Sequence, residues 1–107
     1  MLKIEGTNIT LVRGDTGVIN AVITVDGVSY VLRDTDNCVF SVKTDYDNKE
    51  YALQKTAVNG KFQLTHADTK DLEAGGYVWD MQLTTGAGDV VTVGPGKLKL
   101  LADVTRE

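Results

Sequence analysis

The sequence contains one cysteine, one proline and one histidine in 107 residues. Because Cys38 has no second cysteine to pair with, an internal disulfide is excluded and a disulfide-framed secreted module is not indicated. The N-terminal stretch lacks a basic segment followed by an apolar run, and no segment approaches the roughly 20 apolar residues of a membrane span. We therefore expect a chain that is made and folded in the cytosol, under reducing conditions, with no membrane partner.

Clusters of basic residues are also absent. The formal net charge is −4, and the 11 Lys and Arg residues are scattered along the chain. A nucleic-acid surface normally shows a basic patch or stripe, so the sequence predicts no nucleic-acid partner. His66 and Cys38 lack the spacing of metal ligands, and Cys38 heads an apolar strand face, where cysteine acts as a small core residue. We predict no catalytic residue, no metal, no cofactor and no enzymatic activity.

The clearest element present is a strand that begins at Tyr77. Two sets of residues alternate along it with period two, namely Tyr77, Trp79, Met81 and Leu83 against Val78, Asp80, Gln82 and Thr84. We assign the first set to the core and expect Asp80 and Gln82 to be largely exposed. Just before the strand, Leu72, Gly75 and Tyr77 have the spacing of a tyrosine corner, in which the phenol hydrogen-bonds to the backbone a few residues upstream.

Shorter alternating segments surround this strand. We expect strands at Leu2–Ile4, Ile9–Leu11, Val18–Val25, Val28–Leu32, Cys38–Lys43, Tyr51–Thr56, Lys61–Thr65, Val90–Val93 and Lys97–Leu101. Asp26-Gly27, Asn59-Gly60 and Gly86–Gly88 predict hairpin turns, whereas Gly94–Gly96 is expected to break the strand ladder. Residues 67–71 allow at most one helical turn, with Asp68 as its cap.

The pattern predicts one domain over residues 1–107, long enough to bury roughly two thirds of its unfolded surface. About 7–9 short strands at near-regular spacing, with no long helix, are typical of an all-β antiparallel sandwich or barrel. The tyrosine corner favours the sandwich, although the turn spacing alone allows a closed barrel.

Two stretches carry a resemblance to a known family. LVRGDTGVINAVI near the start and HADTKDLEAGGYVWDMQLTTGAGDVVTVGPGKLKLLADVTR near the end are similar to the immunoglobulin-like modules of tailed-phage and prophage structural proteins, notably the N-terminal domain of phage baseplate upper proteins. The resemblance covers somewhat over half of the chain, whereas residues 34–59 match only in having strands. It implies an immunoglobulin-like β-sandwich and a structural role in a phage tail or baseplate.

Two functional hypotheses follow. The first is a non-enzymatic structural or assembly protein of a phage or prophage particle, found in the virion and, during assembly, in the bacterial cytoplasm. Its partners would be other virion or tail proteins, and self-association is left open. The second is a ligand-binding accessory domain, either carbohydrate-binding or adhesive. Neighbouring tail or head genes would favour the first hypothesis, and a secretion signal would favour the second.

Association through sheet edges is the mechanism expected for the first hypothesis, because an edge strand offers unpaired N–H and C=O groups to a partner. The terminal strands are the candidate edges. The candidate interface residues are Leu2, Ile4, Lys97, Leu98 and Lys99. Lysines on an edge discourage indiscriminate pairing while permitting a specific partner.

Three polar segments could suggest other sites. Asp34–Asn37 and Asp45–Asn48 resemble calcium-ligand clusters, but they flank one predicted strand and would lie at its opposite ends, about 20 Å apart. Solvated loop carboxylates are the favoured interpretation, and cation binding by either loop is left open. Arg13-Gly14-Asp15 matches an integrin-binding tripeptide, but a tight turn with solvated or mutually paired charges is favoured.

Overall fold

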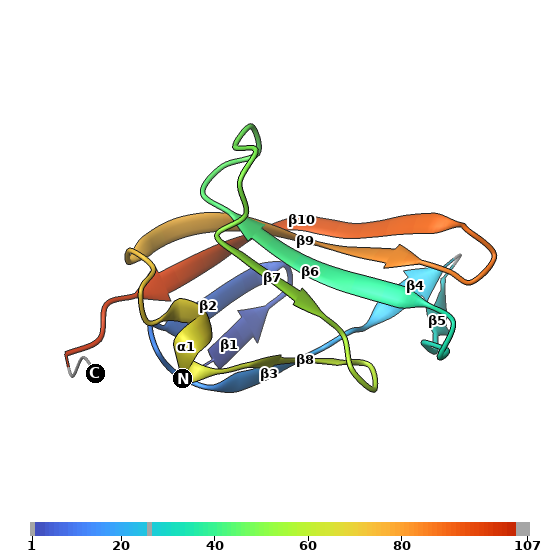
Figure 1. The fold of residues 1–107 in the computed structure, drawn as a ribbon, viewed down its shortest axis with the longest axis horizontal. Helices are drawn as coiled ribbons and strands as arrows, with labels where there is room; N and C mark the ends of the chain where they lie inside the picture. Colours follow the sequence, from blue (N-terminus) through green and yellow to red (C-terminus); the bar gives the residue numbers. More distant parts are fainter. Residues whose placement is uncertain (1, 26, 105–107) are drawn as a thin grey trace.

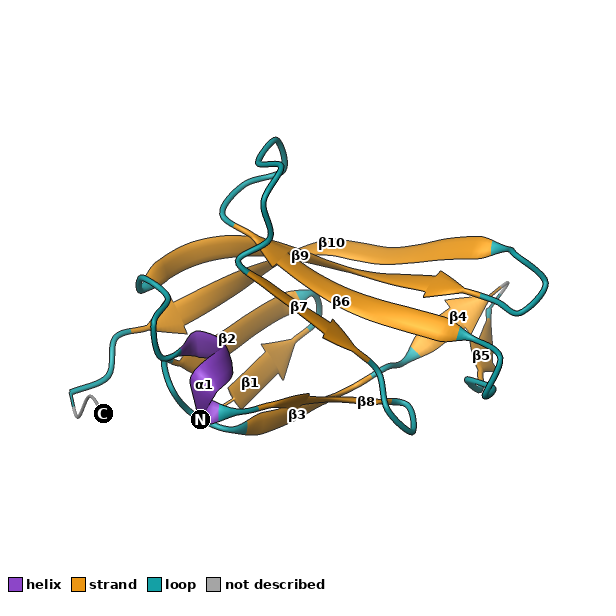
Figure 2. Ribbon diagram, in the orientation of Figure 1, coloured by secondary structure: helices purple, strands orange, loops and turns teal. Residues whose placement is uncertain are grey.

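The computed structural model describes residues 2–25 and 27–104, which form ten strands and one short helix. The strands are β1 (Leu2–Glu5), β2 (Asn8–Val12), β3 (Gly17–Asn20), β4 (Ile23–Val25), β5 (Val28–Tyr30), β6 (Asn37–Lys43), β7 (Leu53–Thr56), β8 (Lys61–Leu64), β9 (Gly75–Thr84) and β10 (Val90–Leu101). Helix α1 covers His66–Thr69, and strands dominate the rest of the described chain (Figure 2). The prediction of an all-β chain with a single helical turn is confirmed.

Six strands form one large sheet in the order β1-β2-β10-β9-β6-β7. All neighbours are antiparallel except β2 and β10, which run parallel, so the expectation of a purely antiparallel fold is wrong. A parallel pair needs a long crossover connection, which residues 13–89 provide here. Local alternation cannot reveal this pairing, because a strand has the same period in either orientation.

Two ribbons, β3–β8 and β4–β5, make up the remaining strands. In Figure 1, β3 and β8 lie below the large sheet, and β4–β5 lies at its right-hand end. A ring contact joins the layers, because the ring centres of Phe40 of β6 and Phe62 of β8 lie 5.6 Å apart. Within the large sheet, the Phe40 ring also lies 5.6 Å from that of Trp79 on the neighbouring strand β9. One cluster of buried apolar side chains fills the space between them.

The central strand β9 has the predicted register. Trp79, Met81 and Leu83 are buried and Gln82 is exposed, as alternation requires. Asp80 is half-buried rather than largely exposed. Asp80 does lie on the opposite, open face of the sheet, but it lines a groove described below, whose walls partly cover it.

The predicted strand Val18–Val25 is interrupted. Strand β3 pairs with β8 and β4 pairs with β5, and between them the amide of Ala21 donates to the carbonyl of Gly60 at 2.8 Å. The chain therefore leaves one ribbon and enters another at Ala21. Strand β5 ends at Tyr30, earlier than predicted, and Asp26 of the predicted hairpin turn lies outside the described residues.

The Asn59-Gly60 turn forms, but the strands around it do not pair as a hairpin. Val58 and Lys61 exchange hydrogen bonds of 2.8 and 3.1 Å, and Asn59 and Gly60 both have positive φ. Strand β7 then pairs with β6, whereas β8 pairs with β3. The turn carries the chain from the large sheet to a ribbon, which turn residues alone cannot indicate.

Gly94-Pro95-Gly96 forms a bulge inside β10 and does not end the strand. The register with β9 shifts between Val93 and Gly96 and then continues to Leu100. Gly96 is buried against Trp79, whose indole Nε1 donates to the carbonyl of Thr7 at 3.0 Å. A Cβ at Gly96 would lie 2.2 Å from that carbonyl oxygen and 2.6 Å from Nε1. The glycine therefore lets β10 pass close to the tryptophan.

Helix α1 is capped differently from the prediction. Thr65 is its N-cap, and Asp68, three residues later, accepts a hydrogen bond from the Thr65 amide at 2.7 Å. Asp68 therefore reaches back to the start of the helix, as in a capping box, and does not cap the amides that follow it.

Candidate functional site

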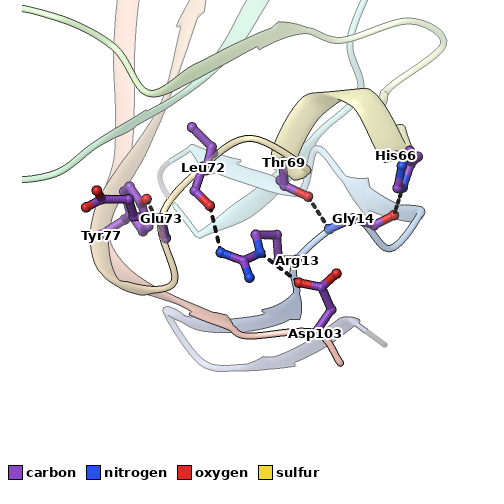
Figure 3. Close-up of polar contacts among 8 residues, drawn as sticks. All are labelled: Arg13, Gly14, His66, Thr69, Leu72, Glu73, Tyr77 and Asp103. Atoms are coloured by element: carbon purple, nitrogen blue, oxygen red, sulfur yellow. Dashed lines mark hydrogen bonds and ion pairs between the residues drawn. The ribbon is translucent and has the colours of Figure 1, made fainter. Parts of the chain in front are cut away.

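A polar cluster around Arg13, shown in Figure 3, holds the end of β2 against two distant segments. The Arg13 Nε donates to Asp103 Oδ1 at 2.7 Å, and its guanidinium also donates to the carbonyl of Leu72 at 3.2 Å. The Arg13 side chain is only 11% exposed. This guanidinium therefore joins β2, the α1–β9 connection and the residues after β10.

Gly14 links the same region to α1. Its amide donates to the Thr69 hydroxyl at 2.7 Å, and its carbonyl accepts from His66 Nδ1 at 2.8 Å. A Cβ at Gly14 would lie 3.1 Å from the His66 ring, and the residue has a φ of +85°. The Arg13-Gly14-Asp15 segment thus forms the predicted turn, but Arg13 pairs with Asp103 and is not solvated.

The tyrosine-corner residues lie beside this cluster. The Tyr77 hydroxyl donates to the carbonyl of Glu73, four residues upstream, and Gly75 between them has a φ of +146°. Burial, and after it the negative charge of Glu73, raises the pKa of Tyr77. Leu72 packs against the core, and its carbonyl is the acceptor for Arg13. Leu72, Gly75 and Tyr77 therefore form part of one structural connection.

The residues expected at the interface are not brought to one edge. Strand β1 is an edge strand, as predicted, with Leu2 half-buried and Ile4 48% exposed. The prediction that Lys97–Leu101 is an edge is wrong, because β10 lies between β2 and β9. Leu98 is buried, whereas Lys97 and Lys99 lie exposed on the open face. Lys97 and Lys99 therefore do not protect a sheet edge from indiscriminate pairing, contrary to the prediction.

The first acidic loop, Asp34–Asn37, connects two segments of the chain. One Asp36 oxygen accepts from the Tyr30 hydroxyl at 2.7 Å and from the Arg33 amide at 2.9 Å, and the other accepts from the Gly86 amide at 3.1 Å. The Tyr30 hydrogen bond is the largest cause that lowers the pKa of Asp36. Asp36 therefore connects the β5–β6 segment to the β9–β10 turn.

The second acidic loop, Asp45–Asn48, is braced by hydrogen bonds from its own side chains. Asp45 Oδ1 accepts from the amides of Asp47 and Asn48, both at 2.9 Å, and Asn48 bonds to Thr44 and Glu50. Within the described residues, no group of three or more His, Cys, Asp or Glu side chains could hold a metal ion. Cys38 is buried, and burial raises the pKa of its thiol, which keeps it protonated.

A groove with a volume of about 190 Å³ lies on the open face of the large sheet. Its floor comes from β6 and β9, and the β6–β7 loop, which rises above the sheet in Figure 1, supplies two aromatic side chains. Tyr46 and Tyr51 in this loop are 61% and 51% exposed. The other lining residues are Val39, Ser41, Lys43, Gln54, Val78, Trp79, Asp80, Gln82 and Pro95.

No protein-family model matches the chain, and no curated protein shows significant similarity to it. Within the described residues, no helix has the length and apolar character that crossing a bilayer requires.

Sequence reasoning missed this groove. The alternation assigned Tyr77 and Trp79 to the core, and both are buried. The available signal was the pair Tyr46 and Tyr51 in a loop that is otherwise acidic and polar. Aromatic residues in such a loop have no core to enter, so they remain on the surface.

An exposed apolar region, separate from the groove, borders the β4–β5 ribbon. Val22, Val28, Val31 and Val58 are largely exposed. They lie on or next to segments that line an open cavity of about 530 Å³, with Cys38 and Ala57 among its lining residues. The ribbon pairs with no other strand in the described part of the chain. Its outer backbone groups are therefore open to further pairing.

Proposed function

We propose that the protein is a non-enzymatic assembly module of a phage or prophage particle, with an immunoglobulin-like sandwich fold. The RGDT-like loop and the DL-x-x-G-x-Y run, on which the resemblance rests, form the Arg13 cluster and the tyrosine corner. The two-layer, strand-rich architecture is compatible with this fold class. Its place would be the virion and, during assembly, the bacterial cytoplasm.

The observation that carries the proposal is the free edge of β1. This strand pairs with β2 and with no other strand in residues 2–25 and 27–104. Ile4 on it is half-exposed, and Lys3 and Glu5 form an exposed ion pair of 2.8 Å. An added strand from a tail or baseplate protein would satisfy the backbone groups and cover Ile4. Leu2 and Ile4 would be the contact residues.

The test is capture of partners from a lysate of a phage-carrying or prophage-induced host, with identification by mass spectrometry. The immobilised protein is expected to recover tail or baseplate proteins, and Ile4→Glu is expected to lose them. Val90→Glu is the matched control, because Val90 is similarly exposed but lies on β10, outside the proposed contact strand β1. Failure to recover virion proteins, or equal loss with both variants, would reject the proposal.

A ligand-binding accessory domain is the second candidate function. The observation that favours it is the tyrosine-lined groove, which lies on a different surface from β1.

A further inference from the structure

We propose that the groove on the open sheet face is a saccharide-binding site, in which Tyr46 and Tyr51 stack on a sugar ring and Asp80 and Gln82 hydrogen-bond to its hydroxyl groups. The inference rests on the ligand-binding candidate function, concerns this groove alone and does not depend on an assembly role. Its basis is the combination of exposed aromatic rings, unpaired polar side chains and a braced loop within one small concavity.

The aromatic side of the site is held in place by the loop. Lys43 Nζ lies 4.9 Å from the centre of the Tyr51 ring, a distance typical of a cation–π contact. This contact fixes the ring, and Tyr51 still remains half-exposed, so ring surface is left for a ligand. The backbone turn that carries Tyr46 is braced by two hydrogen bonds, from the amides of Asp47 and Asn48 to the Asp45 carboxylate. Preorganised rings lose little conformational entropy when a ligand binds.

The polar side of the site is a row of groups across three strands. Gln54 of β7 lies opposite Ser41 of β6, which in turn lies opposite Asp80 of β9, so their side chains share the open face. Gln54 Nε2 donates to the Ser41 hydroxyl at 3.1 Å. The side chains of Asp80 and Gln82 make no hydrogen bond or ion pair in the described structure, which leaves their polar atoms for a ligand.

This composition favours a sugar over other ligands. A sugar ring has an apolar C–H face that suits an aromatic ring and a rim of hydroxyls that both donate and accept hydrogen bonds. The volume of about 190 Å³ is below the 300–1,000 Å³ typical of drug-sized ligands, so the groove suits one ring of a saccharide. A proline-rich peptide also packs on aromatic grooves but has less use for a carboxylate and two amides.

The test begins with an array of immobilised neutral, amino-sugar and bacterial-surface oligosaccharides, probed with the full chain. The strongest hit is then titrated in solution and followed by amide chemical shifts. We expect binding that shifts the amides of Ser41, Asp80 and Gln82. Tyr51→Ala is expected to weaken binding by about tenfold or more, whereas Tyr51→Phe keeps the ring and most of the affinity.

Val90→Ala is the control for the same sheet face, because Val90 is exposed there and does not line the groove. Both tyrosines are exposed loop residues, so their variants should keep the wild-type thermal midpoint; Gln82→Ala provides an independent variant on the sheet. Absence of array binding, or affinity unchanged in Tyr51→Ala and Gln82→Ala, would overturn the proposal. A proline-rich peptide that shifts the groove amides when no sugar does would also replace it.

Discussion

The guanidinium of Arg13 and the carboxylate of Asp103 are 2.7 Å apart, although 90 residues separate them in the sequence. Their side chains are 11% and 18% exposed, so the pair is largely shielded from water. The same guanidinium donates to the Leu72 carbonyl. Three segments of the chain therefore depend on one side chain.

Removal of this side chain should destabilise the fold. We expect Arg13→Ala to lower the free energy of unfolding by about 2 kcal/mol, because Asp103 and the Leu72 carbonyl both lose a donor in a shielded place. Urea denaturation measures the change. Lys3→Ala removes the exposed Lys3–Glu5 pair and should have little effect. Equal effects of the two substitutions would show that the Arg13 cluster contributes no special stability.

The tyrosine corner makes a second prediction. Tyr77→Phe removes the hydroxyl that bonds to the Glu73 carbonyl while keeping the buried ring. We expect a loss of about 1 kcal/mol or more, because the carbonyl is left without its partner. Tyr46→Phe, at an exposed position, is the control. An unchanged urea midpoint for Tyr77→Phe would argue against a stabilising corner.

The contact between β10 and Trp79 makes a third prediction. Gly96→Ala should destabilise by about 3 kcal/mol or prevent folding, because the new Cβ overlaps the Thr7 carbonyl and the indole. Gly76→Ala is a matched control in β9, where an added Cβ meets nothing within 4 Å. Thermal unfolding followed by tryptophan fluorescence compares the two. If both variants unfold at the wild-type temperature, β10 does not pass Trp79 as closely as described.

Asp36 makes a prediction about pH. Its pKa lies below the ordinary value of 3.8, chiefly because the Tyr30 hydroxyl hydrogen-bonds to it. A depressed folded-state pKa stabilises the fold above about pH 4, and that contribution is lost as the pH falls through the folded pKa. Tyr30→Phe should therefore raise the pKa of Asp36, as measured by NMR titration of its carboxyl carbon. Tyr46→Phe is the control, and an unshifted Asp36 titration in Tyr30→Phe would contradict the assignment.

The elements that sequence predicted well are those with local causes. The alternation from Tyr77 to Leu83 fixed which side chains of β9 face the core, since a one-residue slip would exchange the faces. The turn at Asn59-Gly60 likewise follows from residues that tolerate positive φ.

The elements that sequence missed have distant causes. Whether Lys97–Leu101 is an edge depends on β2, which is more than 80 residues away, and not on its own lysines. The groove joins a loop to two strands, so no single segment contains its signal. The partner of Arg13 is also remote, because a nearby carboxylate in the sequence need not be the nearest one in space.

The parallel pairing of β2 with β10 has a consequence for synthesis on the ribosome. Residues 8–12 are made early, but their second neighbour, residues 97–101, is made almost last. Until then β2 can pair only with β1, and the side that will receive β10 remains open. Such a late, long-range closure slows folding and leaves an unpaired strand edge during translation. The nascent chain is therefore expected to be most prone to wrong pairing just before its final strand emerges.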